Sequence, residues 1–110
     1  MNNYTPHTVV VLDSDDKYHT FPTSGIVARV AMRTAPAADL TDGTPTITVE
    51  YGSADLPVGH SGPCLVSTMF ADAYRAQRGF DGVELFVPDS GPTAIRRDGQ
   101  IVAVRALIRR

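Results

Sequence analysis

The sequence predicts a small α+β domain, with one main helix and a mostly antiparallel or barrel-like sheet of about seven strands. Three observations support this prediction. Short runs of alternating apolar and polar residues recur between turns rich in Gly, Pro and Asp, which is typical of antiparallel strands. Only one stretch has helical spacing. The length of 110 residues, with 43% hydrophobic and 20% charged residues, fits a single domain covering residues 1–110.

The first half of the chain predicts four strands. Residues 7–12 and 18–21 are rich in β-branched and aromatic side chains and flank an Asp-rich turn, so a hairpin is expected there. Residues 26–33 alternate with a period of two, which predicts a third strand, and residues 34–45 are expected to form a loop. Residues 46–51 alternate again, which predicts a strand with one buried apolar face and one solvated face.

The only strong helical pattern covers residues 69–78, where apolar side chains recur every three or four positions. A hydroxyl of Ser67 or Thr68 is expected to cap the helix, because it accepts a hydrogen bond from a free backbone N–H group of the first turn. Gly79 suits the left-handed conformation that often follows a helix end.

Three further strands are expected around and after this helix. Residues 64–66 form a short apolar run before it, and residues 83–87 form another after it. The last hairpin is expected to join residues 93–97 to residues 100–109 across Asp98 and Gly99, because Asp-Gly is a strong hairpin turn.

Charge and cysteine content limit the possible functions. The net charge is −2, so there is no basic field for nucleic acid, and no apolar run is long enough for a membrane span or a signal peptide. Cys64 is the only cysteine, which fits a reducing compartment. We therefore expect a cytoplasmic protein, in the host cytoplasm if a phage encodes it. The small core also favours a homodimer or higher homo-oligomer.

The positive charge consists of nine arginines and one lysine, Lys17. Arg binds phosphate or carboxylate through two hydrogen bonds at once, so this bias favours an anion ligand. A GC-rich genome is the competing explanation.

Three Ser-Gly pairs begin at Ser24, Ser61 and Ser90. Gly lets backbone N–H groups approach an anion closely, and successive N–H groups in a turn can form an anion site. Ordinary turn formation is the competing interpretation. The strand arginines that follow two of these pairs are Arg29, Arg96 and Arg105.

No enzyme motif is recognisable. Phosphate-loop, dinucleotide and Gly-x-Ser-x-Gly patterns are absent, and Cys64 lies in an apolar run that favours a structural thiol. The histidines lack metal-ligand spacing, although His7 and His19 could meet across the first hairpin. We therefore expect a binding protein without catalytic residues, metal or cofactor. A small hydrolase that uses His7 or His60 as a base stays open as an alternative.

Most of the chain outside residues 34–45 and 52–60 resembles a widespread group of small phage and actinobacterial proteins. The resemblance is carried by "TPHTVVVL", "FPTSGIVARV", "LVSTMFADAYRAQRG" and "PDSGPTAIRRDGQIVAVRALI". Where many of those proteins have a second proline, this chain has "FPTSG", which loosens the turn. Their size, phage setting and β-rich make-up are similar to those of viral sponges, which sequester cyclic ADP-ribose-like immune signals of the Thoeris defence.

This resemblance implies a ligand site for a small nucleotide, bound without turnover in a homo-oligomer with pockets near the subunit interface. Charge neutralisation of a pyrophosphate is then expected from Arg29, Arg96 and Arg105. Hydrogen bonds to phosphate or ribose are expected from Ser24, Ser67, Ser90 and Thr93, and Asp89 is expected to accept hydrogen bonds from ribose hydroxyls. Stacking on the adenine is expected from Tyr74 or Phe80. A phage structural or interaction protein is the second alternative, in which the arginines are solvated or ion-paired.

Overall fold

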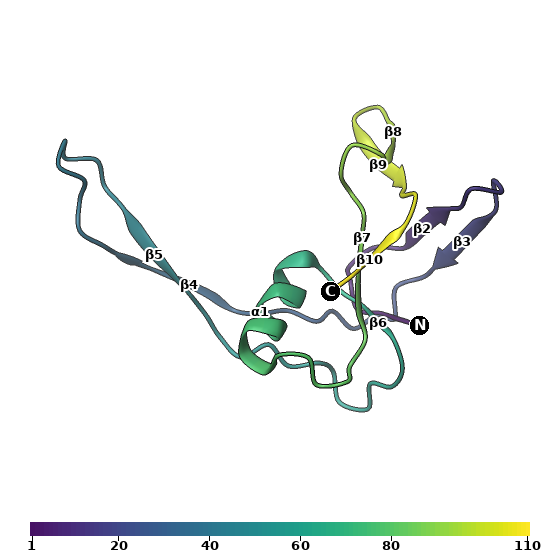
Figure 1. Ribbon diagram of the computed structural model, residues 1–110, viewed down its shortest axis with the longest axis horizontal. Coiled ribbons are helices and arrows are strands. Elements are labelled where there is room, and N and C mark those ends of the chain that lie inside the picture. Colours follow the sequence, from purple (N-terminus) through teal and green to yellow (C-terminus); the bar gives the residue numbers. More distant parts are fainter.

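The computed structural model describes residues 1–110 and shows a small body from which three β-hairpins project (Figure 1). The body contains a four-stranded sheet made of β1 (Asn2–Asn3), β6 (Cys64–Leu65), β7 (Leu85–Pro88) and β10 (Leu107–Arg109), and the single helix α1 (Thr68–Arg78). The hairpins pair β2 (Val9–Leu12) with β3 (Tyr18–Phe21), β4 (Met32–Pro36) with β5 (Ile47–Tyr51), and β8 (Ile95–Arg97) with β9 (Gln100–Ala103).

The body sheet has the strand order β1-β6-β7-β10, so segments far apart in the sequence lie side by side. Strands β1, β6 and β7 are parallel, and β10 is antiparallel to β7. Helix α1 connects β6 to β7, which forms a βαβ unit because parallel neighbours need a crossover connection. Cys64 pairs with Leu85 and Leu65 pairs with Phe86. These parallel pairs put the chain segments that follow the three strands at one edge of the body.

The prediction of an α+β domain with one helix and mostly antiparallel pairing is confirmed. The structure has ten strands in four sheets, and none of the sheets closes into a barrel. The number of strands exceeds the expected seven partly because the last expected strand, residues 100–109, is interrupted after Ala103. Its first part stays in the hairpin as β9, and its second part joins the body sheet as β10.

Helix α1 is capped at its start as the sequence indicates, because the Ser67 hydroxyl accepts a hydrogen bond from the Phe70 N–H at 3.2 Å. Gly79 ends the helix as expected, but its φ of 65° and ψ of −152° lie outside the left-handed helical conformation that was expected. The buried face consists of Phe70, Ala71, Ala73 and Tyr74. No helix in the structure combines the length and the apolar character that crossing a membrane demands.

Arg75 fixes the connection from α1 to β7. Its guanidinium donates to the carbonyl oxygens of Gly79 at 3.1 Å and Val83 at 2.6 Å, and also to that of Arg110. Only 14% of the Arg75 side chain is exposed, so these are shielded, charge-assisted hydrogen bonds. The end of the helix, the segment before β7 and the last residue are thereby held together.

The hairpins β2–β3 and β8–β9 confirm the predicted pairings. Leu12 pairs with Tyr18 in the first. In the second, Asp98 and Gly99 have φ values of 53° and 79°, the positive angles that a type I′ turn requires. The register shifts between Ile95 and Arg96, and such a bulge changes the direction of the side chains beyond it.

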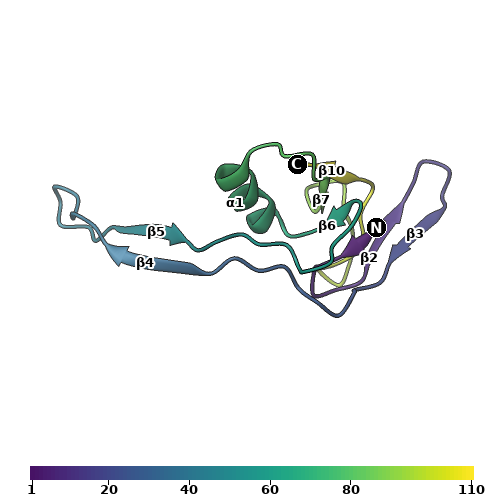
Figure 2. The ribbon, with the colours of Figure 1, turned by 90° about the horizontal axis from the view of Figure 1, so that it is seen from below.

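The β4–β5 hairpin, residues 32–51, is the longest projection, and we call it the arm (Figures 1 and 2). The expectation of a strand over residues 26–33 is wrong for residues 26–31, where the chain bonds only at single points such as Ala28 N–H to the Tyr4 carbonyl at 2.9 Å. The expected loop at residues 34–45 is wrong at its start, because β4 continues to Pro36.

The expected strand at residues 46–51 is confirmed as β5, but its expected buried face is wrong. Ile47, Val49 and Tyr51 are 63%, 44% and 51% exposed, because nothing in the same chain packs against the arm. Figure 2 shows the arm extending away from the body.

The core lies on both faces of the body sheet. Alternation along the strands turns Val66, Leu85 and Val87 toward α1, where they pack with Phe70 and Tyr74. The other face consists of Leu65 and Phe86, which pack against Val9, Val11 and Val104. Because these partners come from β2 and from the residue directly after β9, the second face fixes two hairpins relative to the body.

Candidate functional site

A cavity of about 770 Å³ lies at the carboxyl ends of the parallel strands. Thr5 and His7 follow β1, Ser67 and Thr68 follow β6, and Ser90 follows β7, so all three strands contribute to it. Ligand sites of open α/β sheets commonly lie at this edge. The remaining lining residues are Thr8, Val9, Val10, Pro88, Arg96, Gln100, Ile101, Val102, Ala103 and Val104.

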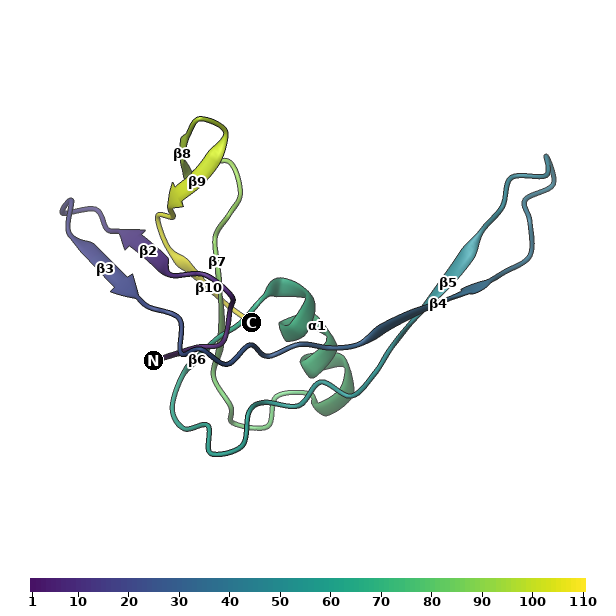
Figure 3. The same cartoon turned by 180° about the vertical axis from the view of Figure 1, so that it is seen from behind.

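Two hairpins form the walls of the cavity. The β2–β3 and β8–β9 hairpins rise from the same side of the body (Figure 3), and Val11 pairs with Val104 between them. Ile101 and Val102 are 40% and 43% exposed, so the wall contributed by β9 presents apolar surface to solvent. The cavity therefore has a polar floor at the strand ends and an apolar side.

Asn3 shapes the floor of the cavity. Its buried amide donates to the carbonyl oxygens of His7 at 2.9 Å and Phe21 at 2.8 Å. Its Oδ1 accepts from the Thr5 N–H at 2.9 Å and lies 2.6 Å from the Thr5 hydroxyl. One side chain thus fixes the loop after β1 and joins it to the end of β3.

The N-terminus of α1 reaches the cavity through Ser67 and Thr68. Backbone N–H groups at a helix N-terminus lack partners within the helix, and the helix dipole makes this end positive. Helix N-termini therefore bind phosphate and other anions. The first turn of α1 contains no acidic residue that would compete for this role.

Arg96 brings a full positive charge to the same cavity. It pairs with Ile101 across the β8–β9 hairpin, and both residues line the wall. The guanidinium makes one long hydrogen bond, from Nη1 to the Gly99 carbonyl at 3.4 Å, and no ion pair. Its other donors are free to bind a ligand.

The charge balance of the lining favours an anion. Its titratable side chains are those of His7 and Arg96, and none of the lining residues is Asp or Glu. The hydroxyl groups of Ser67 and Ser90 add neutral donors. The cavity thus combines a helix N-terminus, a guanidinium and hydroxyls around one polar floor.

Five of the ten expected ligand-binding residues lie in or beside the cavity. Those in the lining are Ser67, Ser90 and Arg96. Asp89 and Thr93 belong to the loop between β7 and β8, where the Thr93 hydroxyl lies 3.3 Å from Asp89 Oδ2. Asp89 Oδ1 also accepts from the Gly91 N–H at 3.3 Å, so these two residues fix the loop that carries Ser90.

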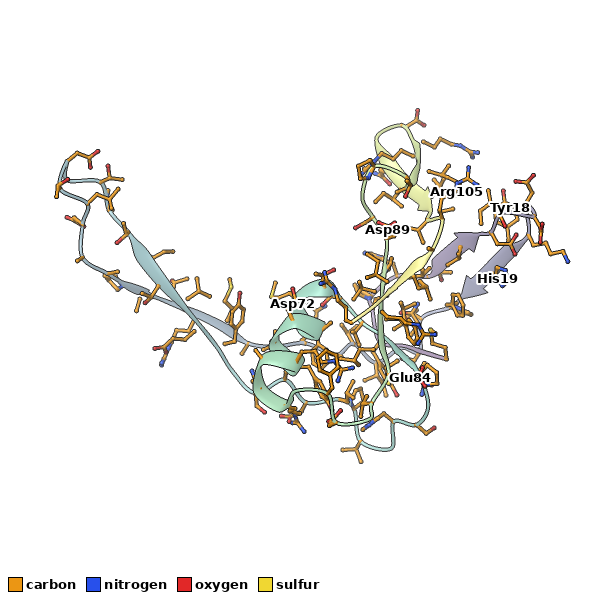
Figure 4. The ribbon with its side chains drawn as sticks, in the orientation of Figure 1. Tyr18, His19, Asp72, Glu84, Asp89 and Arg105 are labelled. Atoms are coloured by element: carbon orange, nitrogen blue, oxygen red, sulfur yellow. The ribbon has the colours of Figure 1, made fainter.

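Ser24, Arg29 and Arg105 lie outside the lining. The Ser24 hydroxyl donates to the Ile26 carbonyl at 3.1 Å, which is a bond within its own turn. Arg29 is exposed on the segment that leads into the arm. Arg105 is exposed directly after the lining residue Val104, and Figure 4 shows it beside the β8–β9 hairpin.

The two expected stacking rings also lie elsewhere. Tyr74 is 3% exposed, and its hydroxyl donates to Asp81 at 2.6 Å. Burial, together with this hydrogen bond, raises the pKa of Tyr74. Phe80 is 85% exposed, with the Arg75 guanidinium 4.8 Å from the ring centroid. Phe80 follows the C-terminal end of α1, and 11 residues of helix span about 16 Å, so the ring is far from Ser67 at the other end.

The histidines do not converge. His19 Nε2 lies 2.7 Å from Asp13 Oδ2, and this hydrogen bond is the main cause of the lowered pKa of Asp13. His7 is exposed at the cavity, and His60 Nδ1 lies 3.1 Å from the Pro57 carbonyl.

Sequence reasoning missed several lining residues, above all Thr5, Thr8 and Gln100. Thr8 directly precedes β2 and Gln100 begins β9, and neither position carries a signal for a ligand site. The signal for Thr5 is its position just after the parallel strand β1, the usual place for ligand-binding side chains. That signal is readable only once β1 and β6 are recognised as parallel neighbours, and each has two residues.

Comparisons with protein-family models, with curated proteins and with solved structures find no match to this chain.

Proposed function

We propose that this protein binds and sequesters a small nucleotide signal of the cyclic ADP-ribose type without converting it. The observation that carries the proposal is the cavity, where the N-terminus of α1, Arg96 and several hydroxyls surround one polar floor. A volume of about 770 Å³ lies within the range of about 300–1,000 Å³ that small-molecule sites occupy.

Each part of the cavity suits one part of such a ligand. The helix N-terminus and Arg96 suit a pyrophosphate, because both offer donors and positive charge. The hydroxyls of Ser67 and Ser90 suit phosphate or ribose oxygens. The apolar wall that includes Ile101 suits the face of a base. Binding of this kind needs no general base. In its phage-type role, the protein captures the nucleotide signal in the host cytoplasm.

His7 supports a second candidate function, a small hydrolase of the same signal. It is the only imidazole of the lining, and an exposed imidazole at a cavity can act as a general base. The hydrolase predicts a shortened ligand that forms with time, whereas the sponge predicts a ligand of unchanged mass.

A capture-and-release experiment tests both. The purified protein is incubated with cyclic and linear ADP-ribose species and cyclic dinucleotides. Unbound ligand is removed and the protein is heated. The released molecules are then identified by mass spectrometry. Stoichiometric release of an intact species supports sequestration, and release of a shortened species supports hydrolysis. If no species is captured, the nucleotide proposal is wrong.

Arg96→Ala and Arg97→Ala provide a matched pair. Both residues are exposed neighbours on β8, but only Arg96 lines the cavity. Loss of a hydrogen bond to a charged group costs about 1.5–3 kcal/mol, so Arg96→Ala is expected to weaken ligand binding about 10- to 100-fold. Arg97→Ala is expected to bind like the wild type. Equal effects of the two changes would refute the role of Arg96.

A further inference from the structure

The arm has one face that carries no charge. In the β4–β5 ladder, residues that pair across the strands point to the same side. The side chains on one side are those of Met32, Thr34, Pro36, Ile47, Val49 and Tyr51, and we call this set the apolar arm face. The other side carries Ala35, Thr48 and the ion pair between Arg33 and Glu50.

The apolar arm face is uncovered within one chain. Met32 is 55% exposed, and Ile47, Val49 and Tyr51 are similarly exposed. Figure 4 shows the arm's side chains with no other segment of the chain against them. A two-stranded hairpin by itself is marginally stable in water, so a further surface is needed to stabilise this one.

The root of the arm is fixed to the body. The Gly52 N–H donates to the Ala31 carbonyl at 2.8 Å, which closes the two strands at their base. Gln77 on α1 donates to the Gly52 carbonyl at 2.8 Å and accepts from the Ala54 N–H at 2.8 Å. These bonds hold the arm away from the body, so its face is presented to a partner.

The surface of the chain is larger than a compact monomer requires. The accessible area is 7326 Å², whereas a compact protein of 11.8 kDa exposes about 5,900 Å². The difference, about 1,400 Å², exceeds the roughly 800 Å² that each partner buries in a standard interface. The radius of gyration of 16.9 Å likewise exceeds the value of about 13 Å for a compact chain of this length.

We infer that the apolar arm face docks on the same face of a second copy of this chain, related by a two-fold axis. Two uncharged faces can meet without like-charge repulsion, and a two-fold interface uses the same patch on both partners. Stacked ribbons of this kind bury the side chains between them, as in a β-sandwich.

Charge complementarity favours an antiparallel arrangement of the two arms. The tip carries Asp39 and Asp42, and the segment that leads into the root carries Arg29, which has no ion pair within its own chain. In an antiparallel pair, the acidic tip of each arm lies toward the Arg29 segment of the other. Val49 and Thr34, which pair at the centre of the ladder, then lie nearest the axis.

The first test is the mass of the protein in solution, measured without ligand by sedimentation or light scattering. The wild type is expected to have twice the mass of one chain. Val49→Lys is expected to halve the measured mass, because it places a charge in the interface. Thr48→Lys, on the opposite face of the same strand, is expected to keep it. A monomeric wild type, or equal masses for the two variants, would overturn the inference.

A second test does not depend on the folding of Val49→Lys. Val49→Cys and Thr48→Cys are treated with a short bis-maleimide, while the native Cys64 is fully buried and serves as the internal control. Crosslinked dimer from Val49→Cys but not from Thr48→Cys supports the docking. Equal crosslinking contradicts it. Both tests work without nucleotide, so their failure is distinguishable from failure of the proposed function.

Discussion

Replacement of Asn3 by Ala is expected to destabilise the domain far more than replacement of its neighbour Asn2. The Asn3 side chain is 1% exposed and takes part in four polar contacts of 2.6–2.9 Å. In the Ala variant, the Thr5 N–H loses its acceptor in a buried place. The Asn2 side chain donates a single exposed hydrogen bond, to the Ser61 carbonyl at 3.1 Å.

The magnitude follows from these contacts. The Thr5 hydroxyl keeps the His7 carbonyl as an acceptor at 2.9 Å. A buried donor without a partner costs about 1–3 kcal/mol, and each of the two lost amide bonds, to the His7 and Phe21 carbonyls, costs about 1 kcal/mol, so Asn3→Ala is expected to lose about 3–5 kcal/mol. Because one kcal/mol shifts the melting temperature of a domain of this size by about 4 °C, the expected drop is about 12–20 °C. Asn2→Ala is expected to lose about 0.5 kcal/mol, as surface changes usually do.

Urea and thermal unfolding of both variants, followed by circular dichroism, measure the difference. All samples need the same protein concentration, because self-association stabilises the folded state by mass action. If Asn3→Ala loses less than about 1 kcal/mol, water replaces the amide at little cost, and the reasoning is refuted.

Two further predictions concern titratable groups. Burial raises the pKa of the Cys64 thiol and shields it from solvent. Cys64 is therefore expected to react with an aromatic disulfide reagent only as fast as the protein opens. The reaction is measured by absorbance, and rapid reaction in native buffer would contradict the burial of Cys64. The Tyr74 hydroxyl, followed by the Val83 N–H, lowers the pKa of Asp81. This carboxylate therefore stabilises the fold above its unfolded pKa of about 3.9, and the contribution is lost as the pH falls through the lower folded value. Asp81→Asn is expected to flatten the acid side of the stability profile measured by urea unfolding, and an unchanged profile would argue against the Tyr74 contact.

The sequence predicted those parts of the fold that local chemistry decides. The β2–β3 hairpin follows from alternation around an Asp-rich turn, β8–β9 follows from Asp98 and Gly99, and α1 follows from its apolar spacing and the Ser67 cap. The parallel body sheet was not predictable in this way. Two of its strands have two residues each, and pairing between distant segments leaves no periodic signal in so short a run.

The amphipathic pattern of β5 shows how far local reasoning extends. Alternation correctly separated Ile47, Val49 and Tyr51 from the polar face, but it does not indicate which surface covers them. The expectation of burial assumed a covering surface within the same chain.

The candidate site was predictable in part. Ser67, Ser90 and Arg96 were singled out as polar residues at turns and strand ends, and the fold brings them to one cavity. The same criterion also selected Ser24 and Arg29, which the fold places outside it. A polar residue at a turn or strand end is recognised from local sequence. Whether that residue lies in the cavity depends on the strand order of the body, which local sequence does not reveal.

The strand order of the body also determines when the protein can fold. Each hairpin closes within a contiguous segment, and isolated hairpins form in roughly 1–10 μs. The body sheet instead requires Asn2 to meet Cys64 and Pro88 to meet Leu107. Because synthesis proceeds at about 5–20 residues per second, the segments of the β2–β3 and β4–β5 hairpins are made seconds before β10. Folding is therefore expected to finish only after β10 has been made, and to be slowed by these long-range pairings. Throughout that interval the apolar arm face is exposed on the nascent chain.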